Sequence, residues 1–222
     1  MKIEELIVQL ASTAGPVRPL PRPSVRLTRW TAGVIPLIAL SVMVIGPRED
    51  VAAAIRQPTF IVLALVTFAT ALFAAASAFV LSVPGAKRAS ISRTTALTAG
   101  SVWAFVLMVR LMEGGDPARR LLVLPIHLLC VVEIAGLGFV PGWALFAMLR
   151  RAAPLRQAWS GALAALAAAA LGAAATQVLC PLDDPAHHLV GHLLPVILLA
   201  AAGTIAGRRA FDWLRRRPNP FP

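Results

Sequence analysis

The chain has 222 residues, of which 58% are hydrophobic and 14% charged, and its mean hydropathy is +0.77. A soluble fold of this size cannot bury so much apolar surface, so the composition excludes a water-soluble domain and indicates a protein embedded in lipid. In such a protein the net charge of +11 indicates basic loops on the cytoplasmic side and argues against direct binding to nucleic acid.

The chain begins with a short amphipathic pattern over residues 2–12. Apolar residues recur at helical spacing beside acidic ones, namely Ile3, Leu6, Ile7 and Leu10 with Glu4 and Glu5. So short a helix is marginal in water, so it either lies against lipid or the protein's own loops, or docks on a soluble partner. Prolines and arginines from Pro16 to Pro23 then form a semi-rigid extended spacer. Residues 1–28 are therefore predicted to be a cytoplasmic partner-binding arm.

Residues 29–209 are predicted to be an all-α integral membrane domain, a bundle of six transmembrane helices. Each apolar stretch is close to the ~20 residues needed to cross the hydrocarbon. The stretches are Trp30–Ile45, Thr59–Ser82, Thr95–Met112, Val131–Leu149, Trp159–Leu179 and Leu189–Gly207. Residues 210–222 remain as a basic tail.

The basic residues between these stretches predict the orientation of the bundle. Six crossings put both termini on one side, and that side receives 16 of the 21 lysines and arginines. Because basic residues are concentrated in cytoplasmic loops, both termini are predicted to be cytoplasmic. The five on the other side are Arg48, Arg56, Arg110, Arg119 and Arg120.

In this topology both cysteines and all four histidines lie on the outer side. Cys130 opens the fourth apolar stretch and Cys180 ends the fifth. Measured from the turn near Ala153, their distances along the two helices differ by only about 6 Å in height. Adjacent antiparallel helices would therefore bring the two sulfur atoms to a similar depth, and the small residues of the fifth stretch permit close approach.

Three interpretations of this outer group are compatible with the sequence. The cysteines form a structural disulfide in an oxidising compartment, they act as a reversible thiol switch, or they ligate a soft transition-metal ion such as zinc or copper. The predicted ligand set for the third interpretation is Cys130, Cys180, Asp183, His187, His188 and His192. His187 or His188, five or four residues before His192, would share a helical face with it.

Glu133 is the acidic residue well inside an apolar stretch, three positions after Cys130. An acidic residue inside a membrane suggests a functional role. Glu133 lies only one helical turn from the interface, however, where water or Arg110 would hydrogen-bond or pair with its carboxylate. Phosphate-binding, metalloprotease, serine-hydrolase and C-x-x-C motifs are absent from the sequence, and the cytoplasmic loops are too short for a catalytic domain. The sequence therefore argues against an enzyme.

Several short motifs occur in a recognisable order along the six-helix pattern. They are Pro16-Val17-Arg18-x-Leu20, Gly46-Pro47-Arg48, Val83-Pro84-Gly85, Cys130-x-x-Glu133, Cys180-Pro181-x-Asp183 with a following histidine, and Gly207-Arg208-Arg209. With the short starting helix, they make the chain resemble the NrsF-type negative regulators. These are membrane anti-sigma factors that hold an extracytoplasmic-function sigma factor at the bacterial inner membrane.

The resemblance implies that Cys130 and Cys180 are the sensing pair and that the N-terminal segment contributes to sigma binding. We therefore predict a membrane anti-sigma factor that releases its partner on a periplasmic stress signal. The alternative prediction is a small membrane metal-binding, transport or redox-cofactor protein that uses the same outer cysteines and histidines. The two differ in whether residues 1–15 are needed for function.

Overall fold

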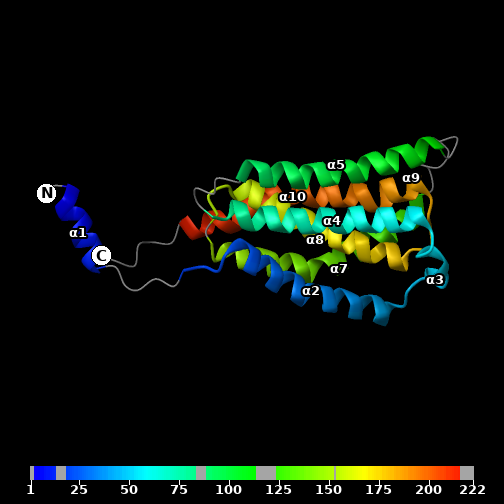
Figure 1. Cartoon of the computed structure of the whole chain (residues 1–222), viewed down its shortest axis with the longest axis horizontal. Helices are drawn as coiled ribbons and strands as arrows, with labels where there is room; N and C mark the ends of the chain where they lie inside the picture. Colours follow the sequence, from blue (N-terminus) through cyan, green and yellow to red (C-terminus); the bar gives the residue numbers. More distant parts are fainter. Residues whose placement is uncertain (1–2, 14–18, 84–88, 114–123, 153, 216–222) are drawn as a thin grey trace.

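The computed structural model describes residues 3–13, 19–83, 89–113, 124–152 and 154–215, and within these ranges the chain is helical without strands. A bundle of long helices lies side by side, and a separate short helix stands beyond one end of it (Figure 1). The helices are α1 (Ile3–Thr13), α2 (Pro23–Ile45), α3 (Val51–Ala54), α4 (Pro58–Leu81), α5 (Ala89–Glu113), α7 (Leu124–Arg150), α8 (Gln157–Leu179), α9 (Pro185–His187), the π-helix η1 (His188–Leu193) and α10 (Leu194–Arg215).

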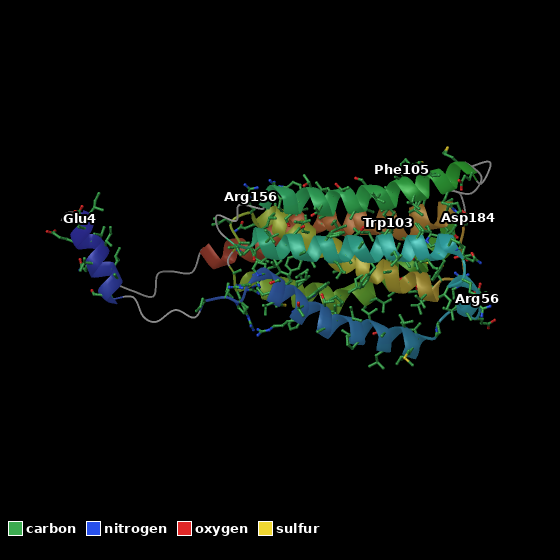
Figure 2. The ribbon with its side chains drawn as sticks, in the orientation of Figure 1. Glu4, Arg56, Trp103, Phe105, Arg156 and Asp184 are labelled. Atoms are coloured by element: carbon green, nitrogen blue, oxygen red, sulfur yellow. The ribbon has the colours of Figure 1, made fainter. Side chains whose placement is uncertain are left out.

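Six helical segments are long and apolar enough to cross a membrane, as predicted. The sixth is composite, because α9, η1 and α10 follow one another without a break. Large apolar side chains cover the outside of the bundle: in α5, Phe105 points away from the bundle and is 68% exposed, whereas Trp103, two residues earlier, points inward and is 1% exposed (Figure 2). An apolar exterior of this kind is what lipid requires.

Several helices extend beyond the predicted stretches. α2 begins at Pro23, inside the segment assigned to the arm, because proline fits the first turn of a helix, where its missing N–H costs nothing. α10 continues through Arg215, so the first residues of the predicted tail are helical. Residues 1–2, 14–18 and 216–222 of the predicted arm and tail, and the motif residues Pro84 and Gly85, lie outside the described residues.

α8 is the central helix, with 15 of its 23 residues buried, seven of them alanine. Small side chains let its neighbours approach closely. A Cβ at Gly161 would collide with the backbone of Gly203 and Gly207 in α10, and one at Gly172 would collide with the backbone of Ile134 in α7. α8 is therefore the fixed axis against which α7 and α10 are placed.

The two ends of the bundle carry different features. Arg156 lies at one end, and Arg56 just after α3 and Asp184 before α9 lie at the other (Figure 2). We call them the Arg156 end and the α9 end. α1 stands beyond the Arg156 end (Figure 1). Every described residue of α1 is exposed, including Ile3 at 75%, Ile7 at 59% and Leu10 at 61%.

Candidate functional site: a buried cluster of cysteine and histidine

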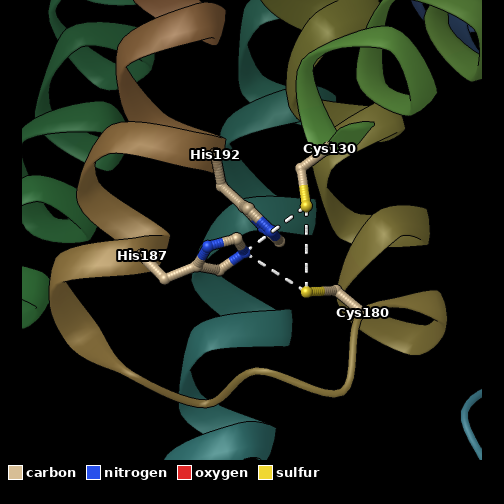
Figure 3. A group of neighbouring side chains, drawn as sticks. All are labelled: Cys130, Cys180, His187 and His192. Carbon is tan, nitrogen blue, oxygen red and sulfur yellow. Dashed lines mark hydrogen bonds between the residues drawn. The ribbon is translucent and has the colours of Figure 1, made fainter. Parts of the chain in front are cut away.

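Four predicted site residues meet at the α9 end of the bundle. Cys130 lies in the second turn of α7, and Cys180 directly follows α8. Their Sγ atoms are 3.8 Å apart, and His187 Nε2 lies 3.4 Å from Cys130 Sγ and 3.2 Å from Cys180 Sγ (Figure 3). The donor atoms of these three residues and of His192 all lie within 4.8 Å of one another. We call these four residues the Cys/His cluster.

A π-helical turn brings the two histidines of the cluster together. Residues five apart in an α-helix differ by about 140° around the axis, so His187 and His192 would point in different directions. η1 replaces the α-helix over His188–Leu193, and its i→i+5 spacing aligns residues five apart. The ring centroids of His187 and His192 are 5.3 Å apart as a result.

All four cluster residues are buried, and His192 is fully so at 0% exposure. Apart from an interaction with Cys180, the ring nitrogens of His192 have no hydrogen-bond partner within the described residues. A buried polar atom without a partner costs stability. A metal ion bound to a ring nitrogen would remove this cost.

The separations among Cys130, Cys180 and His187 are close to the edges of a tetrahedral zinc site, and His192 lies near enough to be the fourth ligand. With Zn–S near 2.3 Å and Zn–N near 2.05 Å, a tetrahedron has S···S edges of about 3.8 Å and S···N edges of about 3.6 Å. The observed separations are 3.8 Å for S···S and 3.4 and 3.2 Å for S···N. Two thiolates and two imidazoles form a closed set of the structural-zinc type. The buried group therefore fits a transition-metal ion.

The remaining residues of the predicted ligand set occupy other places. His188 is buried beside the cluster, with its ring centroid 4.6 Å from that of His192, but it belongs to no four-donor group in the described residues. Asp183 uses both carboxylate oxygens to bind Arg48. Glu133 is partly buried and has no ion pair with Arg110 within the described residues.

Arg48 fixes the loop that carries Cys180. The sequence placed Arg48 in the Gly46-Pro47-Arg48 motif but did not predict this role. Its side chain is 2% exposed and donates hydrogen bonds to the Cys180 carbonyl at 3.0 Å and to Asp183 at 2.8 Å. Hydrogen bonds with Asp50 and then Asp183 raise the pKa of Arg48, and Arg48 lowers the pKa of Asp50. The guanidinium therefore stays charged while the loop is held.

Cys180 is the cysteine that favours the thiolate form. The hydrogen bond donated by the Cys130 thiol, followed by that of His187, lowers the pKa of Cys180 against the opposing effect of burial. The thiolate is the form of cysteine that binds metal ions and reacts with thiophilic reagents. The chemistry of the cluster therefore centres on Cys180.

The assignment of His192, and not His188, as a metal ligand predicts different Zn²⁺ affinities for variants of the two residues. His192→Gln is expected to weaken Zn²⁺ binding by more than about 100-fold because it removes a ligand, whereas loss of an adjacent supporting group costs at most about 10–100-fold. His188→Gln is the matched control, and its loss of Zn²⁺ affinity is expected to be less than about 100-fold. Competition titrations with a chromophoric chelator measure both affinities. Equal losses in the two variants would contradict the assignment of His192 as a ligand.

Comparison with known proteins places the chain in a family. No curated protein and no solved structure matches it. The family model described as "Negative regulator of sigma F" matches residues 10–213, which include all six candidate membrane spans and the whole Cys/His cluster. The family is regulatory and is not a family of enzymes. A match over nearly the whole length shows that this chain belongs to the NrsF family of negative regulators of sigma F.

Proposed function

We propose that this protein holds an extracytoplasmic-function sigma factor at the bacterial inner membrane and releases it when the Cys/His cluster changes state. The observation that carries the proposal is the family match over residues 10–213. It supports a sigma factor as the partner, and the six apolar helices support a membrane location. The partner binds at one end of the bundle and the signal acts at the other.

The distribution of charge supports an orientation with the Arg156 end in the cytoplasm. Basic residues concentrate in the segments that meet at that end, including Arg150, Arg151, Arg156, Arg208 and Arg209. The α9 end carries the acidic residues Asp50, Asp183 and Asp184. Under the positive-inside rule the α9 end then faces the periplasm, together with the cluster.

α1 supplies the surface for sigma binding. Its apolar residues Ile3, Leu6, Ile7 and Leu10 are all exposed, and Glu4 and Glu5 lie beside them. An exposed apolar stripe on a short helix is suited to a hydrophobic groove on a soluble protein, in the helix-in-groove mode. Binding in that groove would keep the sigma factor from RNA polymerase.

The Cys/His cluster is the proposed sensor, and Cys130 and Cys180 are its reactive pair. The closeness of two sulfur and two imidazole donors supports a soft transition-metal ion as its ligand. Such an ion, when bound, would fix the distance between α7 and the loop after α8. A thiophilic metal ion that competes for the two sulfurs would change that distance, and this change is the proposed signal.

The test compares sigma-factor retention by three forms of the full-length protein in membranes. The intact protein is expected to co-purify with an extracytoplasmic-function sigma factor, and deletion of residues 2–15 is expected to abolish this. Ile7→Glu places a charge in the apolar stripe and is expected to weaken retention by at least about tenfold, the cost of a buried unpaired charge in an interface. Immunoblotting of the sigma factor in washed membranes measures the change.

Val8→Glu is the matched control for Ile7→Glu. Val8 is 67% exposed, like Ile7 at 59%, but lies on the other side of α1 from the stripe. It is expected to retain the sigma factor.

The cluster also favours a second candidate function, a small membrane protein that binds, carries or uses a metal ion. Absence of a co-purifying sigma factor from both the intact protein and the form that lacks residues 2–15 would favour this second function.

A further inference from the structure

We propose that α2 transmits the state of the Cys/His cluster to the N-terminal arm, and that Arg48 and Arg26 are the positioning residues that connect it. The proposal rests on the proposed function. Each arginine binds one of the two elements that carry the cluster cysteines. Arg48 holds the Cys180 loop at the α9 end, and Arg26 holds α7, the helix of Cys130, at the Arg156 end. α2 joins these two contacts and leads directly into the arm.

The contact at the α9 end is close to the cluster. Arg48 lies three residues after the end of α2, and Gly46 between them has a φ of 96° that turns the chain sharply toward α8. The backbone N–H of Arg48 donates to the Val178 carbonyl at 3.0 Å, and its guanidinium donates to the Cys180 carbonyl at 3.0 Å. A displacement of Cys180 therefore pulls on the end of α2.

The contact at the Arg156 end is equally specific. Arg26 is 4% exposed, and its guanidinium donates to the Met148 carbonyl of α7 at 2.6 Å and to Ser82 Oγ at 2.8 Å. It also lies over the ring of Phe79, 4.6 Å from the centroid. Burying an arginine is costly unless its donors are satisfied. This geometry therefore selects one position of α2 relative to α7.

Apart from these polar contacts α2 is weakly attached. Only Arg26, Trp30 and Val34 are buried among its 23 residues, compared with 15 of 23 in α8. Trp30 adds a second polar contact to α7, because its Nε1–H donates to the Pro141 carbonyl at 3.0 Å. Toward the α9 end Met43 and Val44 are 77% and 78% exposed. A helix held by a few polar contacts moves with the groups that it contacts.

These contacts couple α2 to the separation of the two cysteines. Met148 follows Cys130 by 18 residues along α7, about 27 Å at 1.5 Å per residue. If the Cys180 loop shifts relative to α7, α2 cannot keep both the Arg48 and the Arg26 contacts unless it moves. The movement reaches residues 19–22 and the arm that carries α1. The two arginines thereby connect a change at the α9 end to the surface proposed to bind the sigma factor.

The test follows amide hydrogen exchange in the full-length protein in lipid nanodiscs, with Zn²⁺ and after EDTA treatment. In the wild type, removing Zn²⁺ is expected to raise exchange over residues 20–30 at least fivefold, about the lower limit of typical allosteric coupling. Arg48→Gln is expected to lose this dependence on Zn²⁺. Arg26→Gln is expected to exchange rapidly in both conditions, and any loss of Zn²⁺ affinity is expected to be no larger than the factor by which Zn²⁺ changes wild-type exchange, because coupling is reciprocal.

Arg29→Gln is the matched control, because Arg29 lies on the same helix and is exposed. It is expected to keep the Zn²⁺-dependent change. The proposal is overturned if wild-type exchange is independent of Zn²⁺, or if Arg26→Gln keeps the wild-type response. Neither readout requires a sigma factor, so sigma retention by the same wild-type protein tests the proposed function separately.

Discussion

Cys180→Ser is expected to remove bound zinc from the purified protein, from about one ion per chain to nearly none. The hydroxyl group of serine replaces the thiolate without changing the packing much, but it is not a ligand for zinc under ordinary conditions. Because loss of a group that only supports a ligand costs up to about 100-fold in affinity, loss of the ligand itself is expected to cost more. Metal analysis of protein purified from membranes measures the stoichiometry, and the absorption spectrum of the Co²⁺-substituted protein reports tetrahedral thiolate coordination.

Asp183→Asn is the matched control for Cys180→Ser. Asp183 lies three residues away in the same loop, and it belongs to the ligand set predicted from the sequence. In the structure its oxygens bind Arg48, so the variant is expected to keep its metal and its Co²⁺ spectrum. Zinc retained by Cys180→Ser, or zinc lost from Asp183→Asn, would contradict the assigned ligand set.

The sequence predicted the parts of this molecule that depend on regular helix geometry. Apolar stretches of suitable length predicted six crossings, because lipid leaves few other ways to satisfy the backbone. The meeting of Cys130 with Cys180 also followed, because their distances from the hairpin turn are similar and α8 is lined with small residues. Both inferences need only the rise per residue of an α-helix and the direction of each segment.

The rest of the site depends on departures from regular geometry. A pure α-helix would place His188 beside His192 and turn His187 away, but with the π-turn both rings lie near His192, and it is His187 that reaches the two sulfur atoms. No residue pattern in the sequence marks a π-turn. The role of Arg48 was equally hidden, because it depends on three carbonyl and carboxylate groups more than 130 residues away in sequence. Such contacts follow from the tertiary arrangement and have no local signal.

Gly172→Leu is expected to disturb the cluster from a distance, through the packing of α7 on α8. A Cβ at Gly172 would collide with the Ile134 carbonyl oxygen and lie 3.2 Å from the Gly138 nitrogen. Both contacts are backbone atoms that cannot rotate away, so α7 must move outward. Overpacking of this kind costs about 1–3 kcal/mol, and more where the backbone is involved. Ile134 lies one helical turn from Cys130, so the same movement separates Cys130 from Cys180.

The variant is therefore expected to lose both thermal stability and at least tenfold in Zn²⁺ affinity, about 1.4 kcal/mol of lost ligand geometry. Gly136→Leu is the matched control, because a Cβ at Gly136 meets nothing within 4 Å. Thermal unfolding in detergent and chelator competition measure the two quantities. If Gly172→Leu loses stability but binds Zn²⁺ as the wild type does, the cluster adapts independently of helix packing. A joint loss would mean that the α7–α8 separation and the cysteine separation are one degree of freedom, which is what a sensor that reports metal binding through helix movement requires.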